Sequence, residues 1–203
     1  LWLAAIGIIG DLADGSGFEE MDEARAFGIA ALRKAVSLAN APRRSSSGDA
    51  SAAFALLEKA AGPKEVMSGV WPETAVLVAA QEEVRRETDE ARKAAPKIVG
   101  EVAIVPFSSP CQVHPLIAQS WSRRLKTPIV IAANTGFRPG WVHFAARSSR
   151  DVDLLAFFER VRPPGADEQY GKGHRLASGG ALRIGDWNIF VRDLGFPGLV
   201  QPG

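Results

Sequence analysis

The chain has 203 residues, 46% of them hydrophobic and 23% charged, which is enough for one mid-sized domain or two small ones with a packed core. Its single cysteine excludes a framework of intrachain disulfides and favours a reducing, cytoplasmic location, and its apolar runs fall short of the roughly 20 residues of a membrane span. The net charge of +1 excludes a strongly polyanion-attracting chain, although residues 98–203, with 12 basic and 8 acidic residues, are more basic than residues 1–97, with 12 and 15.

The chain opens on an apolar segment, residues 1–10, and Asp11 follows it directly. This segment lacks the basic leader of a secretory signal. Because the sequence starts without Met inside an apolar run, we expect it to begin within a domain, with further residues before Leu1. A carboxylate at the end of such a segment is placed to hold a divalent metal, while a cap or turn is the commoner role for a single Asp.

Two helices are expected in the front part of the chain. Several acidic residues suit the positive start of a helix over residues 19–41, which Pro42 would end. Asp49 is a candidate cap for a second helix that runs to about residue 61, with Phe54 and Leu57 directed inward.

The longest expected helix covers residues 73–95 and is ended by Pro96. Apolar residues recur along one face at helical spacing, and pairs of opposite charge four residues apart lie on the other: Glu82 with Arg86 and Asp89 with Lys93. A long charged helix between two differently charged halves favours a connector between domains. An ordinary surface helix fits the same pattern.

Short apolar runs replace helical periodicity in the back half of the chain. They predict a small α/β domain over about residues 98–198, because buried strands alternate there with helical segments. The expected strands are residues 102–105, 128–132, 141–144 and 187–191, and the expected helices are residues 114–125 and 152–161.

A glycine-rich segment, residues 170–180, is a candidate phosphate-binding loop that enters a helix. Glycines let the backbone approach a ligand, and successive N–H groups form a concavity that binds anions. Lys172, His174 and Arg175 add basic or hydrogen-bonding side chains. A plain glycine-rich turn remains the commoner structure for such a pattern.

A second candidate anion site lies at residues 146–150, expected between the third strand and a helix opened by Asp151. The Arg147 guanidinium can bind phosphate with two hydrogen bonds, and the Ser148 hydroxyl and the N–H groups of a helix start can complete the site. A helix cap with a solvated arginine fits equally well.

Four further residues are expected to be mainly structural. His114 and His143 fit positions in the core better than ligand positions, and Cys111 fits a packing role because no base accompanies it in sequence. Trp141 is expected in the core, with stacking on a nucleic-acid base as the alternative.

Three of these segments, taken in order, resemble motifs of the DHH-family phosphoesterases, which include RecJ-type single-strand exonucleases. The segments are Gly7-Ile8-Ile9-Gly10-Asp11, Arg147-Ser148, and Gly171-Lys172-Gly173-His174 with Ala177-Ser178-Gly179-Gly180. In that family a metal-binding domain is followed by a long helix and a smaller DHH-associated domain. The resemblance implies an α/β chain with the end of a DHH domain at residues 1–72, a connector helix at 73–97 and a DHH-associated domain at 98–203.

The resemblance also implies functional residues. Asp11 would be a metal ligand, and the substrate-binding residues would be Arg147, Ser148, Lys172, Gly173, His174, Ser178 and Gly179. Lys172 stands where a glycine is frequent in the family. The Asp-His-His triplet that names the family is absent, so Mn²⁺ or Mg²⁺ is expected only in the intact protein and this chain alone should be inactive.

The expected function is therefore the nucleic-acid- or nucleotide-binding portion of a manganese-dependent phosphodiesterase or exonuclease. Its partner would be single-stranded nucleic acid, a short oligonucleotide or a nucleotide. Two alternatives are a pure binding module, similar to the tRNA-contacting C-terminal domain of alanyl-tRNA synthetases, and an inactive scaffold in a replication complex. All depend on Arg147 and His174 facing one shared groove.

Overall fold

The structure is a computed structural model that describes residues 1–11, 13 and 15–202. It divides into two compact units, unit 1 (residues 1–86) and unit 2 (residues 87–203), and the division falls inside one long helix, α6 (Pro72–Ala91). Each unit has its own hydrophobic core. None of the described helices is long and apolar enough to cross a membrane.

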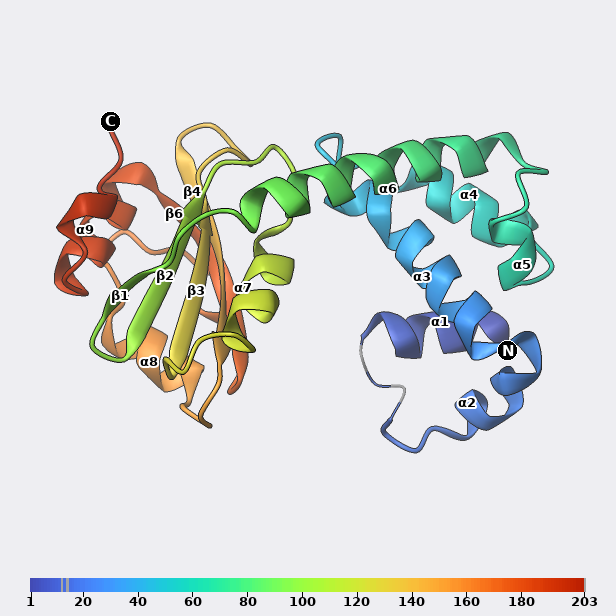
Figure 1. Cartoon of the computed structure of the whole chain (residues 1–203), viewed down its shortest axis with the longest axis horizontal. Helices are drawn as coiled ribbons and strands as arrows, with labels where there is room; N and C mark the ends of the chain where they lie inside the picture. Colours follow the sequence, from blue (N-terminus) through green and yellow to red (C-terminus); the bar gives the residue numbers. More distant parts are fainter. Residues whose placement is uncertain (12, 14, 203) are drawn as a thin grey trace. The chain divides into compact units, whose positions relative to one another are not determined.

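Unit 1 is built from helices (Figure 1). Its core gathers apolar side chains that each helix turns inward, with Leu32, Leu56, Val66 and Leu77 fully buried. Its elements are α1 (Trp2–Gly10), α2 (Glu19–Ala24), a 3-10 turn (Arg25–Phe27), α3 (Ile29–Arg44), α4 (Ser51–Lys59), α5 (Pro63–Val66) and the first part of α6.

The single helix expected over residues 19–41 is wrong, because the chain breaks it at Gly28. This residue has φ +84°, a left-handed conformation that glycine adopts freely and that lies between the 3-10 turn and α3. The expected stop at Pro42 is also wrong, since α3 continues to Arg44. Proline in the last turn removes only one backbone hydrogen bond, which the helix tolerates there.

Two details of the other front helices also differ from expectation. Phe54 is 67% exposed, whereas its neighbour Leu56 is fully buried, so α4 is rotated relative to the predicted face. Near the end of α6, Asp89 pairs with Arg92 and Lys93 with Glu90, at a spacing of three residues instead of four.

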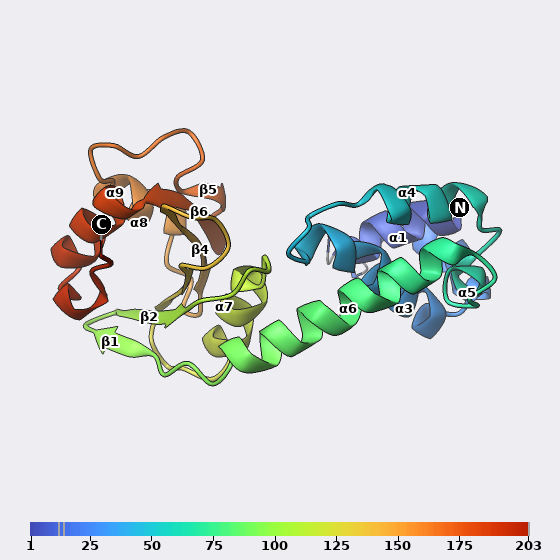
Figure 2. The same ribbon diagram turned by 90° about the horizontal axis from the view of Figure 1, so that it is seen from above.

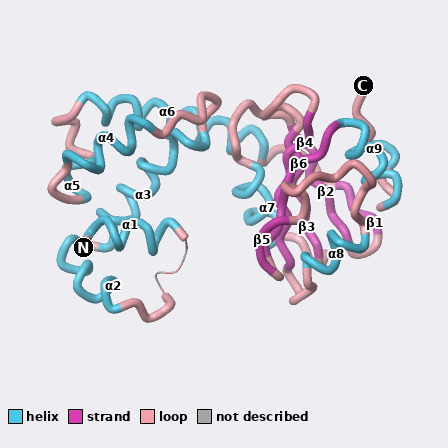
Figure 3. Tube along the Cα trace, turned by 180° about the vertical axis from the view of Figure 1, so that it is seen from behind, coloured by secondary structure: helices cyan, strands magenta, loops and turns pink. Residues whose placement is uncertain are grey.

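Unit 2 contains a six-stranded mixed sheet and confirms the predicted α/β fold class (Figure 3). The strand order is β1-β2-β3-β4-β6-β5, with β2 and β3 parallel and the other pairs antiparallel. The strands are β1 (Lys97–Val99), β2 (Val102–Phe107), β3 (Ile129–Asn134), β4 (Trp141–Ser148), β5 (Lys172–His174) and β6 (Ala177–Arg183).

Helices lie on both faces of this sheet (Figures 1 and 2). On one face α8 (Leu154–Arg160) and α9 (Ile184–Asp193) pack over aromatic and aliphatic side chains; we call this the aromatic face. On the other face α7 (His114–Ser122) packs over β3 and β4. On this same face, β4, β6 and β5 present the alternate residues of each strand, and we call this part the basic face. Its residues are Trp141, His143, Ala145, Arg147, Lys172, His174, Ala177, Gly179, Ala181 and Arg183.

Two expectations for the end of the chain are wrong. The strand expected at residues 187–191 is part of α9, where Trp187, Phe190 and Val191 are buried at helical spacing and Ile189 is exposed. The glycine-rich segment does not enter a helix but forms a β-hairpin, β5 and β6, around a turn at Arg175 and Leu176. The other predicted strands and helices of unit 2 are present within a few residues of their expected bounds.

Candidate nucleic-acid interface

The strand register brings Arg147 and His174 to the same face of the sheet. Arg147 on β4 is opposite Ala177 on β6, and Ala177 is opposite His174 on β5. Residues directly opposite each other in a sheet project their side chains to the same side. The register therefore gives one row across three strands with Arg147 at one end and His174 at the other.

The next row adds a lysine to this face. Ala145 on β4 is opposite Gly179 on β6, which is opposite Lys172 on β5. Adjacent strands lie about 4.8 Å apart, so the row from Arg147 to His174 spans roughly 10 Å between Cα atoms. Side chains of this length can reach one phosphate group between them.

The middle of the basic face carries no bulky side chains, because β6 presents only small residues there. Ala177, Gly179 and Ala181 are half-buried, whereas Ser178 and Leu182, on the other side of the same strand, are buried. A side chain of one carbon or none leaves room above the strand for a ligand. The basic face is therefore a shallow floor edged by long polar side chains.

The charge of this face is uniformly positive or neutral. None of the residues of β4, β5 and β6 is acidic. In the described part of the chain no carboxylate forms an ion pair with Arg147, Lys172 or Arg183. Arg147 is half-buried, and this burial lowers the pKa of its guanidinium from the ordinary value. Arg147 Nη1 donates a 3.0 Å hydrogen bond to the carbonyl of Ala146.

Three of the predicted substrate-binding residues do not join this face. Ser148 Oγ accepts a 2.8 Å hydrogen bond from the Val152 backbone N–H, and Ser178 Oγ donates to the Lys172 carbonyl at 3.1 Å. Both serines, and Gly173 opposite Ser178, lie on the alternate positions that face away from Arg147 and His174. Their hydroxyls hold the loop and the hairpin together.

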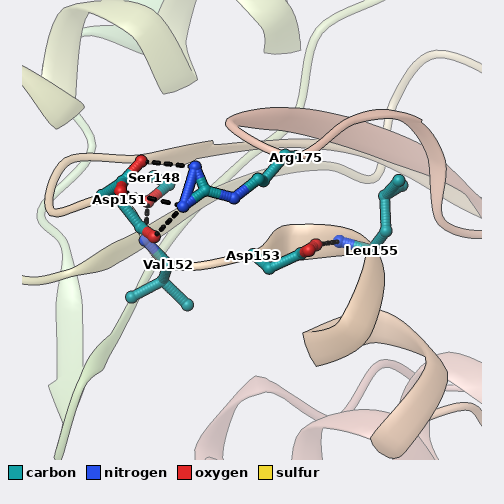
Figure 4. A network of polar contacts seen from close by, with 6 residues as sticks. All are labelled: Ser148, Asp151, Val152, Asp153, Leu155 and Arg175. Carbon is teal, nitrogen blue, oxygen red and sulfur yellow. Dashed lines mark hydrogen bonds and ion pairs between the residues drawn. The ribbon is translucent and has the colours of Figure 1, made fainter.

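The predicted anion site at a helix start is also absent. Arg147 and Ser148 are the last residues of β4, and α8 begins only at Leu154. Asp153 Oδ1 accepts hydrogen bonds from the Leu155 N–H (Figure 4) and from the Ala156 N–H. The Asp153 carboxylate occupies the N–H groups that a phosphate would need. Arg147 therefore lies at a strand end and not at a helix start.

Arg175 is paired and is not a free cation of the glycine-rich segment. Its guanidinium binds both carboxylate oxygens of Asp151, at 2.6 and 2.8 Å (Figure 4). Backbone hydrogen bonds join the same segments, from Ser148 N to Leu176 O and from Leu154 N to Arg175 O. This clamp ties the hairpin turn beside His174 to the loop after Arg147 and so fixes the two ends of the row relative to each other.

Gly173 makes the short hairpin geometrically possible. Its φ of +137° is a conformation that L side chains rarely adopt, and a Cβ atom there would lie 2.3 Å from the Ala177 carbonyl oxygen. The glycine allows β5 to approach β6 closely enough to pair. Gly173 therefore shapes the strand that carries Lys172 and His174.

A histidine cluster lies where α7 meets the basic face. The rings of His114 and His143 are 6.0 Å apart, and Phe137 packs edge-on to His143 at 4.8 Å. Burial lowers the pKa of His114 to about 3, with a smaller effect from His143; burial and then Arg138 lower the pKa of His143. Both rings are therefore neutral at pH 7. Within the described residues, His114 Nδ1 and His143 Nε2 are buried without hydrogen-bond partners.

The predicted metal ligand, Asp11, belongs to no metal-binding cluster among the residues that the structure describes. Asp11 is an exposed residue at the C-terminal end of α1. Across residues 1–11, 13 and 15–202, no group of three or more His, Cys, Asp or Glu side chains is arranged to hold a metal ion. The described residues do not fit a two-metal centre, and we derive no hydrolytic step from them. Cys111 is fully buried, in agreement with a packing role.

The basic face includes two polar side chains that sequence reasoning did not assign to a ligand, those of His143 and Arg183. His143 shares strand parity with Arg147, four residues later, and this alternation was visible in the sequence. The place of Arg183 on this face follows only from the structure of β6. The glycine- and alanine-rich sequence of β6 lacks the β-branched residues typical of strands, so the sequence does not predict a strand there. Trp141, expected in the core, is half-exposed on this face.

No protein-family model matches the chain, and no curated protein matches its sequence. Among solved structures, it is similar to a pGpG-specific phosphodiesterase, PggH from Vibrio cholerae, at 14% sequence identity and a TM-score of 0.45. The similarity covers 70% of this chain and 48% of that protein, so the chain spans about half its length.

Proposed function

We propose that the basic face of unit 2 binds the phosphate groups of a single nucleic-acid strand or a nucleotide, as the substrate-binding part of a phosphodiesterase. The register carries this proposal, because it brings Arg147, Lys172 and His174 into neighbouring rows on one face. Arginine presents a fork that matches two phosphate oxygens, lysine a compact charge, and an imidazole N–H a further donor.

Phosphodiester hydrolysis belongs to the intact protein in this proposal. Mn²⁺ or Mg²⁺ would activate water there. The unit 2 residues would bind and orient the phosphate, and the shallow floor would let the strand approach the sheet closely. Incubation of this chain with Mn²⁺ and a labelled oligonucleotide should leave the strand uncut, and metal-dependent cleavage would overturn this assignment of roles.

Binding itself is testable with a six-nucleotide DNA strand that carries a 5′ phosphate and a 3′ fluorescein. Arg147→Gln and His174→Asn should each weaken its affinity, and about tenfold is expected for Arg147→Gln, because a hydrogen bond to a charged group contributes about 1.5–3 kcal/mol. Fluorescence anisotropy measures both changes.

The matched control is Arg160→Gln. Arg160 is an exposed arginine on α8, which covers the aromatic face, so its replacement removes the same charge from the other side of the sheet. Its affinity should stay within about twofold of the unchanged chain. The logarithmic salt slope should become shallower by about 0.7 for Arg147→Gln only. Equal behaviour of the two arginine variants would contradict the proposal.

A further inference from the structure

The end of the basic face away from Arg147 carries a tryptophan with an arginine stacked on it. Trp141 begins β4 and is opposite Arg183, the last residue of β6. The guanidinium carbon of Arg183 lies 4.8 Å from the centre of the Trp141 ring. Trp141 is half-exposed and Arg183 is exposed, so solvent reaches both.

A second aromatic–arginine pair lies beside the first. Phe137, in the turn between β3 and β4, packs against His143, which is two residues from Trp141 on the same face. The guanidinium of Arg138 lies 5.6 Å from the Phe137 ring centre. Among the residues that the structure describes, neither Arg138 nor Arg183 forms an ion pair. We call Phe137, Arg138, Trp141 and Arg183 the aromatic end.

The two ends belong to one continuous strip. Trp141 and Arg147 are six residues apart on β4, which is about 20 Å at the rise of an extended strand. Between the two ends the floor is formed along β6 by the half-buried residues Ala177, Gly179 and Ala181, with no large side chain from β6 in the path, whereas Ala145 on β4 is buried. Successive nucleotides of a stacked strand are about 3.4 Å apart. A single nucleotide is therefore much shorter than the strip, whereas a strand of several nucleotides matches it.

The chemistry of the aromatic end suits nucleotides better than other anions. Inorganic phosphate or an acidic peptide would use arginines but has no need of rings held at the surface beside them. Every base has a flat face that stacks on an aromatic ring or on a guanidinium group, and phosphates along the strand attract the same arginines. The absence of acidic residues from β4, β5 and β6 extends this match along the whole strip.

We infer that the basic face binds a single strand of several nucleotides, with a phosphate at Arg147, Lys172 and His174 and a base stacked on Trp141 beside Arg183. This inference rests on the proposed function and specifies its ligand: an oligonucleotide is preferred over a mononucleotide, with little dependence on base sequence. Trp141 is a specificity-determining residue for length, because only a strand that passes Ala181 reaches it.

A length series tests this inference. The probes are 5′-phosphorylated deoxyadenosine strands of one, two, four and six nucleotides, measured by displacement of the labelled six-nucleotide strand. Affinity of the unchanged chain should rise with length beyond two nucleotides. Trp141→Ala should lower the affinity for the six-nucleotide strand about 5- to 100-fold, which is the effect of losing one stacked base. The affinity for the mononucleotide should stay the same. Trp141→Phe, which keeps a ring, should retain most of the affinity and guards against a folding defect.

A second variant blocks the path without touching either end. Ala181→Leu places a larger side chain on the half-exposed floor between the ends and should also weaken the long strand selectively. If Arg147→Gln weakens the six-nucleotide strand while Trp141→Ala and Ala181→Leu do not, the inference fails and the proposed function stands. If the unchanged chain binds no probe above the level of Arg147→Gln, both fail.

Discussion

The two faces of the unit 2 sheet use alternate residues of the same strands for different purposes. On the aromatic face, the ring centre of Phe144 lies 5.4 Å from that of Phe158 and 6.1 Å from that of Phe190, and all three rings are almost completely buried. On the basic face, the neighbouring positions of β4 are His143 and Ala145, beside half-exposed small residues. Because side chains alternate along a strand, adjacent residues of β4 belong to the buried core and to the proposed binding surface. Stability and ligand affinity should therefore respond to different substitutions.

Of the substitutions considered, Phe144→Ala on the aromatic face should lower the stability of unit 2 the most. Removal of a fully buried ring from the cluster is expected to lower the free energy of unfolding of unit 2 by about 3–5 kcal/mol. Arg147→Gln, three residues later on the other face, should cost less than about 1 kcal/mol. Hydrogen exchange of the β3 and β4 amides in increasing urea measures the free energy of unfolding of both variants. Similar losses for the two variants would show that the faces are not energetically distinct.

Gly173→Ala should damage the basic face through the backbone. The added Cβ collides with the Ala177 carbonyl and the conformation is strained, so pairing of β5 with β6 should weaken by about 1–3 kcal/mol, together with oligonucleotide affinity. Faster amide exchange confined to the hairpin is the expected sign. Gly185→Ala is the matched control, because its site in α9 has open space and a helical backbone. A hairpin that tolerates alanine at 173 would refute the role given to this glycine.

His114 should make unit 2 sensitive to acid. Its folded pKa of about 3 lies below the unfolded value near 6.5, so the unfolded chain binds a proton first and stability falls as pH decreases from 6.5 towards 3. The expected loss between pH 6.5 and 5 is about 1–2 kcal/mol, at up to about 1.4 kcal/mol per pH unit.

Comparison with His114→Phe isolates this contribution, since other titrating groups are common to both chains. Between pH 6.5 and 5 the variant should lose less stability than the unchanged chain, as measured by urea unfolding or hydrogen exchange. Parallel pH curves for the two chains would mean that folding does not lower the pKa of His114.

Arg175→Gln should have the smallest effect on stability. Both partners of the Arg175–Asp151 pair are more than half exposed, and exposed ion pairs contribute less than about 1 kcal/mol. If the clamp fixes the row from Arg147 to His174, oligonucleotide affinity should nevertheless fall severalfold, with Asp151→Asn giving a similar fall. Unchanged affinity in both variants would show that the row is held by backbone pairing alone.

Much of the unit 2 fold could be predicted because its central strands are continuous apolar runs. The run at residues 102–105 is buried on both faces in β2, and residues 129–132 behave likewise in β3. The pattern at residues 187–191 predicts a strand, but these residues belong to α9, where the buried Trp187, Phe190 and Val191 have helical spacing. A five-residue window is too short to distinguish the two periods.

The candidate site could be predicted in composition but not in arrangement. The sequence predicts Lys172 and His174 from a glycine-rich segment and Arg147 from an Arg-Ser pair after a strand. Their common face follows from the pairing of β4, β6 and β5, a long-range register that no local pattern encodes. The same register separates Ser148 and Ser178 from them. Arg183 was missed because a strand made of small residues carries no strong propensity signal.

Alanine methyl groups give the most direct test of the basic face as the ligand-binding surface. Ala177 and Ala181 are half-buried on this face, whereas Ala146 lies in the aromatic-face core. In a methyl-labelled chain titrated with a 5′-phosphorylated six-nucleotide strand, NMR should show saturable shifts for the first two methyls and almost none for Ala146. Shifts confined to the aromatic face and its helices, or an absence of shifts at saturating strand, would contradict the account.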